Sequence, residues 1–241
     1  MTAYPHLFEP GAIGGLAIRN RIVQPPMGTG LVENGRLSPR DVAFQEERAR
    51  AGVGLIVTGA AAVHPTSLFP VRIIVEAWDE DGIDALRARV DAVQRHGARI
   101  FGQLVHLGRE SPGGLTNTVP MAPSPVASAR DPNPPHEMSV AEVRMIADAF
   151  ATSAVNLQAA GYDGVEIAAG HGYLVAQFLS PASNRRTAPS GFAPCSSPDP
   201  DSTADESVRS GPDVAAPSSR PAWPVSSPEC PARSAPGAEW S

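Results

Sequence analysis

Short apolar runs alternate with amphipathic segments over the first 187 residues of the chain. Four of these runs are continuous in hydrophobicity or rich in β-branched residues, as strands covered on both faces are. They predict buried strands over residues 21–24, 54–58, 100–104 and 164–167. The segments between them repeat apolar residues every three or four positions, which indicates helices.

Capping residues mark the ends of three such helices. Ser38 is suited to be the N-cap of a helix over 41–51, with Pro39 at its first position. A second helix is predicted over 79–96, and a third over 140–160 begins with a Ser139–Glu142 capping box. Strands that alternate with helices form βαβ units and a parallel sheet. We therefore expect an α/β fold of the (β/α)8 TIM-barrel type, truncated to about four of the eight units.

The composition changes near Thr187. Residues 188–241 contain 11 Pro and 12 Ser, and no Leu, Ile, Met or Tyr. Such a segment buries too little side chain to offset its conformational entropy, so we expect disorder there. Either a natural low-complexity tail or a frame-shifted reading of the gene explains the change. We divide the chain into residues 1–187, the N-terminal half of a barrel, and the tail 188–241.

Charge and composition exclude several classes. A net charge of −6 offers no cationic surface for nucleic acid or anionic lipid, and no apolar run is long enough to cross a membrane. The first ten residues do not resemble a signal peptide, so we expect a cytoplasmic protein. Cys195 and Cys230 stand alone in the tail and do not form a metal site.

Candidate chemistry follows the predicted strands, because active sites of such barrels lie at the carboxyl ends of the strands. The first strand leads into Pro25, Pro26, Met27 and Gly28, and the second into a run of small residues around Ala60. A rigid turn also explains the first of these segments, and close packing of a helix against the strand also explains the small residues of the second.

The third and fourth strands carry more polar groups. Gln103 requires partners for both the donor and the acceptor of its carboxamide. His106 and Arg109 are suited either to bind an anion or to hold the loop. After the fourth strand, His171 and Tyr173 are candidates for hydrogen bonding and proton transfer, or a satisfied structural pair.

Taken together, these motifs resemble the Old Yellow Enzyme family of FMN-dependent ene reductases, in the branch that contains 2,4-dienoyl-CoA reductase and trimethylamine dehydrogenase. The resemblance covers roughly residues 5–187. The matching motifs are LFEP at 7–10, NRIV at 20–23, PMG at 26–28, GVGLI at 52–56, QLVHLGR at 103–109, APS at 122–124, GYDGVEI at 161–167, HGYL at 171–174 and QFLSP at 177–181.

The resemblance implies roles for these residues. The residues that would line the flavin are Pro25, Pro26, Met27, Gly28 and Ala60, and Gln103 would bond its pyrimidine edge. His171 would polarise the substrate and Tyr173 would donate a proton to it. The implied reaction is hydride transfer from NAD(P)H to FMN and then to an activated alkene, a small-molecule substrate.

Two departures from the family pattern stand out. Ala168 occupies a position where many relatives have a second polarising His. The pattern also ends after Thr187, before the family's phosphate-binding loops. We therefore expect the chain alone to bind FMN poorly and to be impaired, and its exposed half-barrel edges to self-associate.

Alternatives from other classes are an inactive fragment, a non-enzymatic interaction protein that works through its tail, and a metal-dependent barrel that uses His106 and His171.

Overall fold

The computed structural model describes residues 4–67, 73–113 and 118–187. Its centre is a five-stranded parallel sheet in which β3, β6, β8 and β11 are successive neighbours. These strands span Val23–Gln24, Leu55–Ala62, Arg99–Val105 and Gly164–Ile167, and β7 (Val75–Glu76) pairs with the end of β6. A parallel sheet whose strand order follows the chain order is the arrangement of a (β/α)8 barrel, here over four units.

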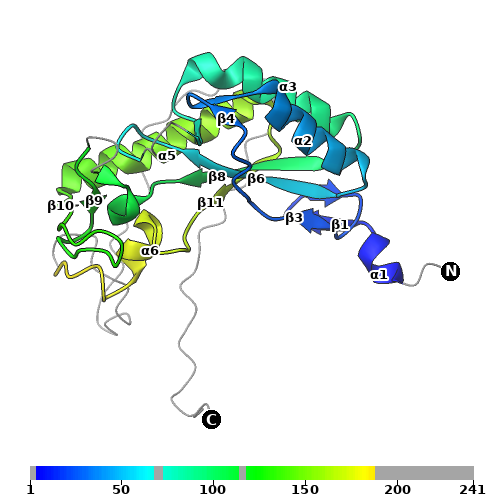
Figure 1. Ribbon diagram of the computed structural model, residues 1–241. Helices are drawn as coiled ribbons and strands as arrows, with labels where there is room; N and C mark the ends of the chain where they lie inside the picture. The colour runs from blue at the N-terminus through cyan, green and yellow to red at the C-terminus, as the bar shows by residue number, and fades with distance from the viewer. Residues whose placement is uncertain (1–3, 68–72, 114–117, 188–241) are drawn as a thin grey trace, which may run out of the picture. The chain divides into compact units, whose positions relative to one another are not determined.

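Three helices connect the strands and lie over one face of the sheet (Figure 1). They are α2 (Pro39–Arg50), α3 (Ile83–Gln94) and α5 (Val140–Ala160). The side chain of Ser38 accepts a hydrogen bond from the Asp41 N–H, and both bonds of the Ser139–Glu142 capping box are present. The main core lies between these helices and the sheet, and includes Ile56, Ile100, Leu104, Leu86, Val90 and Leu157.

An N-terminal hairpin packs on the face of the sheet away from the helices, near the amino ends of the strands. Its strands are β1 (Gly11–Ile13) and β2 (Leu16–Ile18). Ile18 packs with Leu55, Val57 and Phe101, which alternate along β6 and β8 with the residues that face the helices. This face therefore has its own apolar cluster at the amino ends of the strands.

The remaining elements are short, and their periodicity is too brief to be predicted. They are α1 (Pro5–Phe8), the hairpin β4 (Val32–Glu33) and β5 (Arg36–Leu37), the 3-10 helices η2 (Glu80–Gly82) and η3 (Gly108–Glu110), the parallel pair β9 (Met121–Ala122) and β10 (His136–Glu137), and α6 (Leu174–Leu179).

The four predicted strands and three predicted helices are all present, with changes at their ends. The first strand is shorter than predicted, and the second continues past Thr58 to Ala62. The helix over 140–160 agrees at both ends, while the one predicted from residue 79 begins as η2. The tail predicted over 188–241, and with it the domain boundary, lies outside the described residues.

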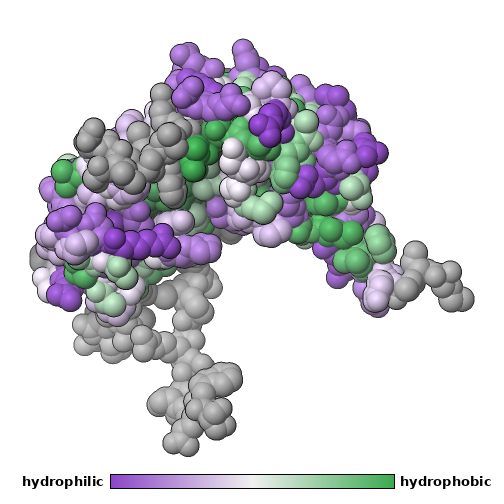
Figure 2. Space-filling view, in the orientation of Figure 1, coloured by the Kyte–Doolittle hydropathy of each residue, from purple (hydrophilic) through white to green (hydrophobic). Residues whose placement is uncertain are grey.

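Apolar side chains are exposed at both edges of the sheet. Val23 on β3 is 44% exposed and Ile167 on β11 is 45% exposed. Figure 2 shows apolar surface near α1, β1 and β3, beside the mainly hydrophilic outer side of α2 and α3. Self-association through these edges stays a prediction. Among the described helices, none has the length and apolar character required to span a membrane.

Candidate functional site at the carboxyl ends of the strands

The segment after β3 lies directly against β6. A Cβ atom at Gly59 would stand 2.1 Å from the Met27 carbonyl oxygen, so only glycine permits this approach. A Cβ atom at Gly28 would meet nothing within 4 Å, and the Met27 side chain is 50% exposed. Pro25 is exposed and Pro26 half-buried. The segment from Pro25 to Gly28 therefore presents an open surface beside the end of β6.

The prediction that Ala60 follows the second strand was wrong. Ala60 lies inside β6, which continues because β8 pairs with one of its edges and β7 with the other. The register with β8 shifts between Thr58 and Ala61, so the strand is irregular at this point. Such irregularities re-aim side chains near the ends of barrel strands.

An apolar cluster joins the ends of three strands. It consists of Val105, Leu107 and Ala168, and both Ala60 and Tyr173 pack against it. Tyr173 thus shares one environment with Ala60, although 113 positions (173 − 60) separate them in the sequence. Residues from β6 and from the ends of β8 and β11 therefore meet in this cluster, which includes neither Gln103 nor Met27.

His171 lies beside Tyr173 on the turn after β11. The centroids of the two rings are 5.9 Å apart, with their planes inclined by 44°. His171 is exposed and has a φ of 56°, a left-handed conformation that is uncommon outside glycine. Among the described residues, neither ring has a hydrogen-bond partner. Both polar groups are therefore available to a ligand.

Gln103 has a partner that the sequence analysis did not name. Its Nε2 donates to Glu166 Oε1 at 2.6 Å, between directly paired residues of β8 and β11. The sign of this partner in the sequence was Glu166 itself, an acidic residue inside a predicted buried strand, where a charged side chain is rare unless it is paired. Within the described part of the chain, the Gln103 carbonyl oxygen accepts no hydrogen bond.

His106 holds the neighbouring loops together. It is 1% exposed, its Nδ1 accepts from the Gly108 N–H at 3.1 Å, and its Nε2 lies 2.9 Å from the Thr66 hydroxyl. Since Nδ1 accepts, the ring proton is on Nε2 and is donated to Thr66. Both ring nitrogens are thus engaged, so His106 serves as a structural residue. Arg109 likewise donates to two backbone carbonyls, those of Val126 and Ala127.

Histidine and acidic residues do not gather into a metal site here. Among the residues that the structure describes, no group of three or more His, Cys, Asp or Glu side chains could hold a metal ion. With both nitrogens of His106 bonded to protein atoms, no observation supports the metal-dependent alternative.

The burial of His106 makes stability depend on pH. Burial, with a smaller contribution from His64, lowers the pKa of His106 to about 3. In the unfolded chain a histidine titrates near 6.5, so below that pH the unfolded state takes up a proton that the folded state does not. We expect the free energy of unfolding to fall by about 1.4 kcal/mol per pH unit between roughly pH 6 and 5 from this residue.

Urea denaturation at several pH values measures this dependence. His106→Asn should lower the slope by the share of His106, because an asparagine in this place does not titrate; His64, whose pKa burial also lowers, keeps its own share. His6→Asn, at an exposed histidine, is the matched control and should leave the slope as it is. An equal slope in His106→Asn and the unaltered chain would show that His106 is not its source.

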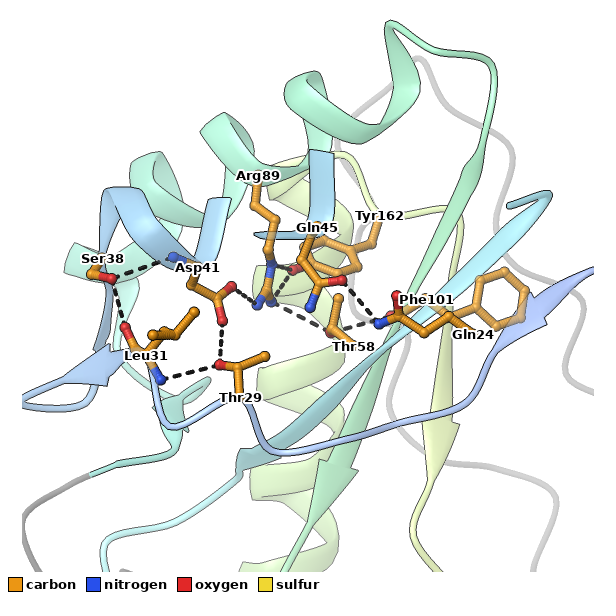
Figure 3. A network of polar contacts seen from close by, with 10 residues as sticks. All are labelled: Gln24, Thr29, Leu31, Ser38, Asp41, Gln45, Thr58, Arg89, Phe101 and Tyr162. Atoms are coloured by element: carbon orange, nitrogen blue, oxygen red, sulfur yellow. Dashed lines mark hydrogen bonds and ion pairs between the residues drawn. The ribbon is translucent and has the colours of Figure 1, made fainter. Parts of the chain in front are cut away.

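Behind the segment after β3 lies a buried polar network, shown in Figure 3. Arg89 on α3 and Asp41 on α2 form an ion pair at 3.1 Å, and both side chains are 3% exposed. The Arg89 Nε also donates to the Tyr162 hydroxyl at 2.8 Å. Burial raises the pKa of Tyr162, so this hydroxyl stays protonated.

The network reaches the open segment through Thr29. The Thr29 hydroxyl donates to Asp41 at 2.7 Å and accepts from the Leu31 N–H at 3.2 Å. A small hollow of about 20 Å³, open to solvent, lies between the network and the segment from Met27 to Thr29. Its lining includes Met27, Gly28 and Ala60 together with Asp41, Gln45 and Arg89. The buried ion pair therefore anchors the backbone that carries Met27 and Gly28.

The fold defines an α/β protein with half of a (β/α)8 barrel, and the candidate ligand site lies at the carboxyl ends of its strands. Residues 6–193 match the family model of the NADH:flavin oxidoreductase / NADH oxidase family. The chain therefore belongs to this family, whose members use FMN with NAD(P)H as reductant.

Known proteins of this family are similar in sequence and structure. An NADH oxidase of Thermoanaerobacter brockii is 40% identical over 188 residues, which are 77% of this chain and 29% of that protein. The structure of 2-naphthoyl-CoA reductase with 2-naphthoyl-CoA aligns with a TM-score of 0.72 at 27% identity, over 76% of this chain and 30% of that one. The Old Yellow Enzyme homologue of Zymomonas mobilis aligns with a TM-score of 0.67 at 27% identity, over 78% and 55%. The chain thus spans about half or less of the length of these relatives.

The residues present fit the ring system of FMN. Gly28 leaves backbone without a Cβ atom at an open surface, as the close approach of a flat ligand requires, whereas the missing Cβ atom of Gly59 admits the Met27 carbonyl. Gln103 has a carboxamide oxygen without a partner among the described residues, and the Met27 side chain is half-exposed. An open stretch of backbone and an acceptor oxygen are groups that the flat face and the N–H of a flavin ring can contact.

Proposed function

We propose that the chain is an FMN-dependent NAD(P)H oxidoreductase of the ene-reductase type, impaired in its binding of FMN, which reduces the activated C=C bond of an enone or a dienoyl thioester. The observation that carries this proposal is the shared environment of Ala60 and Tyr173, beside the open backbone of Met27 and Gly28. Ala60 and Tyr173 pack against one cluster from three strands, and Met27 lines a hollow together with Ala60, which supports a site at the carboxyl ends of the strands.

The residues after β3 and inside β6 would hold the ring. Pro25 and Pro26 stiffen the backbone that carries Met27 and Gly28, because proline fixes φ. Ala60 has a side chain small enough for a ring to lie against it. Gln103 would accept or donate at the pyrimidine edge. FMN, when bound, supplies the hydride that it has received from NAD(P)H.

The residues after β11 would act on the alkene. The exposed His171 ring would donate a hydrogen bond to the carbonyl oxygen of the substrate and withdraw electron density from the C=C bond. The Tyr173 hydroxyl, half-buried beside the apolar cluster, would deliver the proton to the α-carbon. Their ring separation of 5.9 Å lets both groups contact different atoms of one small substrate.

Ala168 favours a thioester over a simple enone. It is buried among Val105 and Leu107 and donates no side-chain hydrogen bond, so the carbonyl would have His171 as its one side-chain donor from this turn. A thioester conjugated to a C=C bond is bulkier than an enone, and a methyl group at position 168 leaves more room than an imidazole. The structural neighbour 2-naphthoyl-CoA reductase was solved with a thioester.

An assay of the purified full chain with excess FMN tests the proposal. NADH or NADPH and either 2-cyclohexenone or a 2,4-dienoyl thioester are added without oxygen, and the product is analysed by mass spectrometry. We expect oxidation of the nicotinamide that depends on the alkene, and in D2O one deuterium at the α-carbon. Product at no more than the protein-free rate would contradict the proposal and favour a fragment without activity or a non-enzymatic protein.

A further inference from the structure

Glu166 and Gln103 face each other on the side of the sheet away from the helices. They are paired residues of β11 and β8, and 2.6 Å separates Glu166 Oε1 from Gln103 Nε2. Along β8, Gln103 alternates with Gly102 and Leu104, and Leu104 belongs to the core beneath the helices. Both side chains are partly exposed. A carboxylate is thus held at the surface where the ring of FMN is proposed to bind.

A carboxylate fixes which end of a carboxamide turns toward it. An ionised carboxylate only accepts hydrogen bonds, so the Gln103 group that faces it must be the amide nitrogen. The amide oxygen then points to the other side, and it has no partner among the described residues. Without Glu166, a glutamine is equally able to offer its oxygen or its nitrogen to a ligand.

We infer that Glu166 is a positioning residue: it orients Gln103 so that Gln103 offers its carbonyl oxygen to an N–H donor of the bound ring. This inference rests on the proposed function and names a requirement of the same site. The pyrimidine edge of a flavin carries an imide N–H between two carbonyl oxygens. Glu166 thus makes the site select the N–H of this edge rather than a carbonyl oxygen.

Two flavin rings that differ at this single group test the inference. Lumiflavin carries the imide N–H, and 3-methyllumiflavin carries a methyl group in its place; neither has a phosphate. Quenching of ring fluorescence on titration with the full chain measures the dissociation constant of each. We expect lumiflavin to bind about tenfold more tightly, which corresponds to about 1.4 kcal/mol and lies at the upper end of the contribution of one hydrogen bond.

The variant Glu166→Gln keeps the size of the side chain but no longer fixes the orientation of the Gln103 carboxamide. The amide at position 166 can pair with Gln103 in either direction, so the preference for lumiflavin should fall below about threefold. Glu166→Ala, which removes the partner altogether, should lose the preference in the same way. Glu80→Gln, at an exposed carboxylate before α3, is the matched control and should keep it.

The outcomes separate the two proposals. A preference that stays near tenfold in both Glu166 variants would overturn the inference and leave the proposed function in place. If the unaltered chain binds neither ring, the proposed function fails and the inference with it. A purely structural role would lower the melting temperature without changing the ratio of the two dissociation constants, so circular dichroism of each variant accompanies the titrations.

Discussion

Arg89→Met is expected to lower the free energy of unfolding by about 3–5 kcal/mol. Arg89 and Asp41 are both almost fully buried, and the guanidinium also bonds Tyr162 and Thr58. Methionine fills a similar volume but leaves the Asp41 carboxylate in the interior without its cation. An unpaired buried charge costs far more than the pair contributes, which is why the loss is large. Urea denaturation followed by circular dichroism measures it.

The same helix offers a matched control. Arg87 on α3 pairs with Asp84, but both side chains are exposed to solvent. Exposed pairs of this kind contribute about 0–1 kcal/mol, so Arg87→Met should change the free energy of unfolding by less than about 1 kcal/mol. The double variant Asp41→Asn with Arg89→Met should recover part of the loss. Equal losses in Arg87→Met and Arg89→Met would contradict the interpretation of the network.

The network links the stability of the helix layer to the proposed site. Asp41 lies in the first turn of α2 and accepts from Thr29, whose backbone follows Met27 and Gly28 directly. Displacement of Asp41 would release this anchor. A buried ion pair is weak evidence for stability by itself. The ion pair between Asp41 and Arg89 has a further role because it lies behind the segment after β3 and holds that segment through Thr29. The ring of FMN is proposed to lie against this segment.

Periodicity was sufficient to predict the large elements of the fold. Continuous apolar runs identify β8 and β11 because their residues Ile100, Leu104 and Val165 pack in the core beneath the helices. Ser139 and Glu142 identify the start of α5 because their side chains satisfy backbone N–H groups that the helix leaves free. Both patterns involve residues that are close in the sequence, so they can be recognised without knowledge of the tertiary structure.

The contacts that build the site are not local and could not be predicted in this way. The buried side of α2 carries Asp41 and Gln45, one helical turn apart, so an apolar pattern does not reveal which side is buried. Arg89 lies on the apolar side of α3, between Leu86 and Val93, and this placement was the available sign of a buried partner. Which residue is the partner of Arg89 depends on how α2 and α3 pack, and a single sequence does not show this packing.

The extension of β6 has a similar cause. Gly59 and Ala60 have low strand propensity, so the strand was expected to end before them. In the structure β8 and β7 supply hydrogen-bond partners on both edges, and small side chains admit the close approach of Met27. Tertiary pairing thus outweighs local propensity where the site is formed.

Tyr173→Phe is expected to slow reduction of the alkene by about 10²- to 10⁴-fold, which is the usual contribution of a positioned general acid. Phenylalanine preserves the ring that packs against Val105, Leu107 and Ala168, so the fold and the binding of FMN should be unchanged. Removal of the hydroxyl takes away the proton for the α-carbon. The rate of product formation with excess FMN measures the effect.

Oxygen distinguishes a loss of proton donation from a loss of structure. Oxidation of NAD(P)H by dioxygen transfers no proton to carbon, so Tyr173→Phe should leave this rate unchanged while alkene reduction falls. Tyr4→Phe, at an exposed tyrosine near the N-terminus, should leave both rates unchanged. A parallel fall of both rates in Tyr173→Phe would mean that the tyrosine shapes the site rather than donates the proton. Unchanged alkene reduction would mean that the proton comes from another group, and the exposed imidazole of His171, 5.9 Å away between ring centres, would be the next donor to replace.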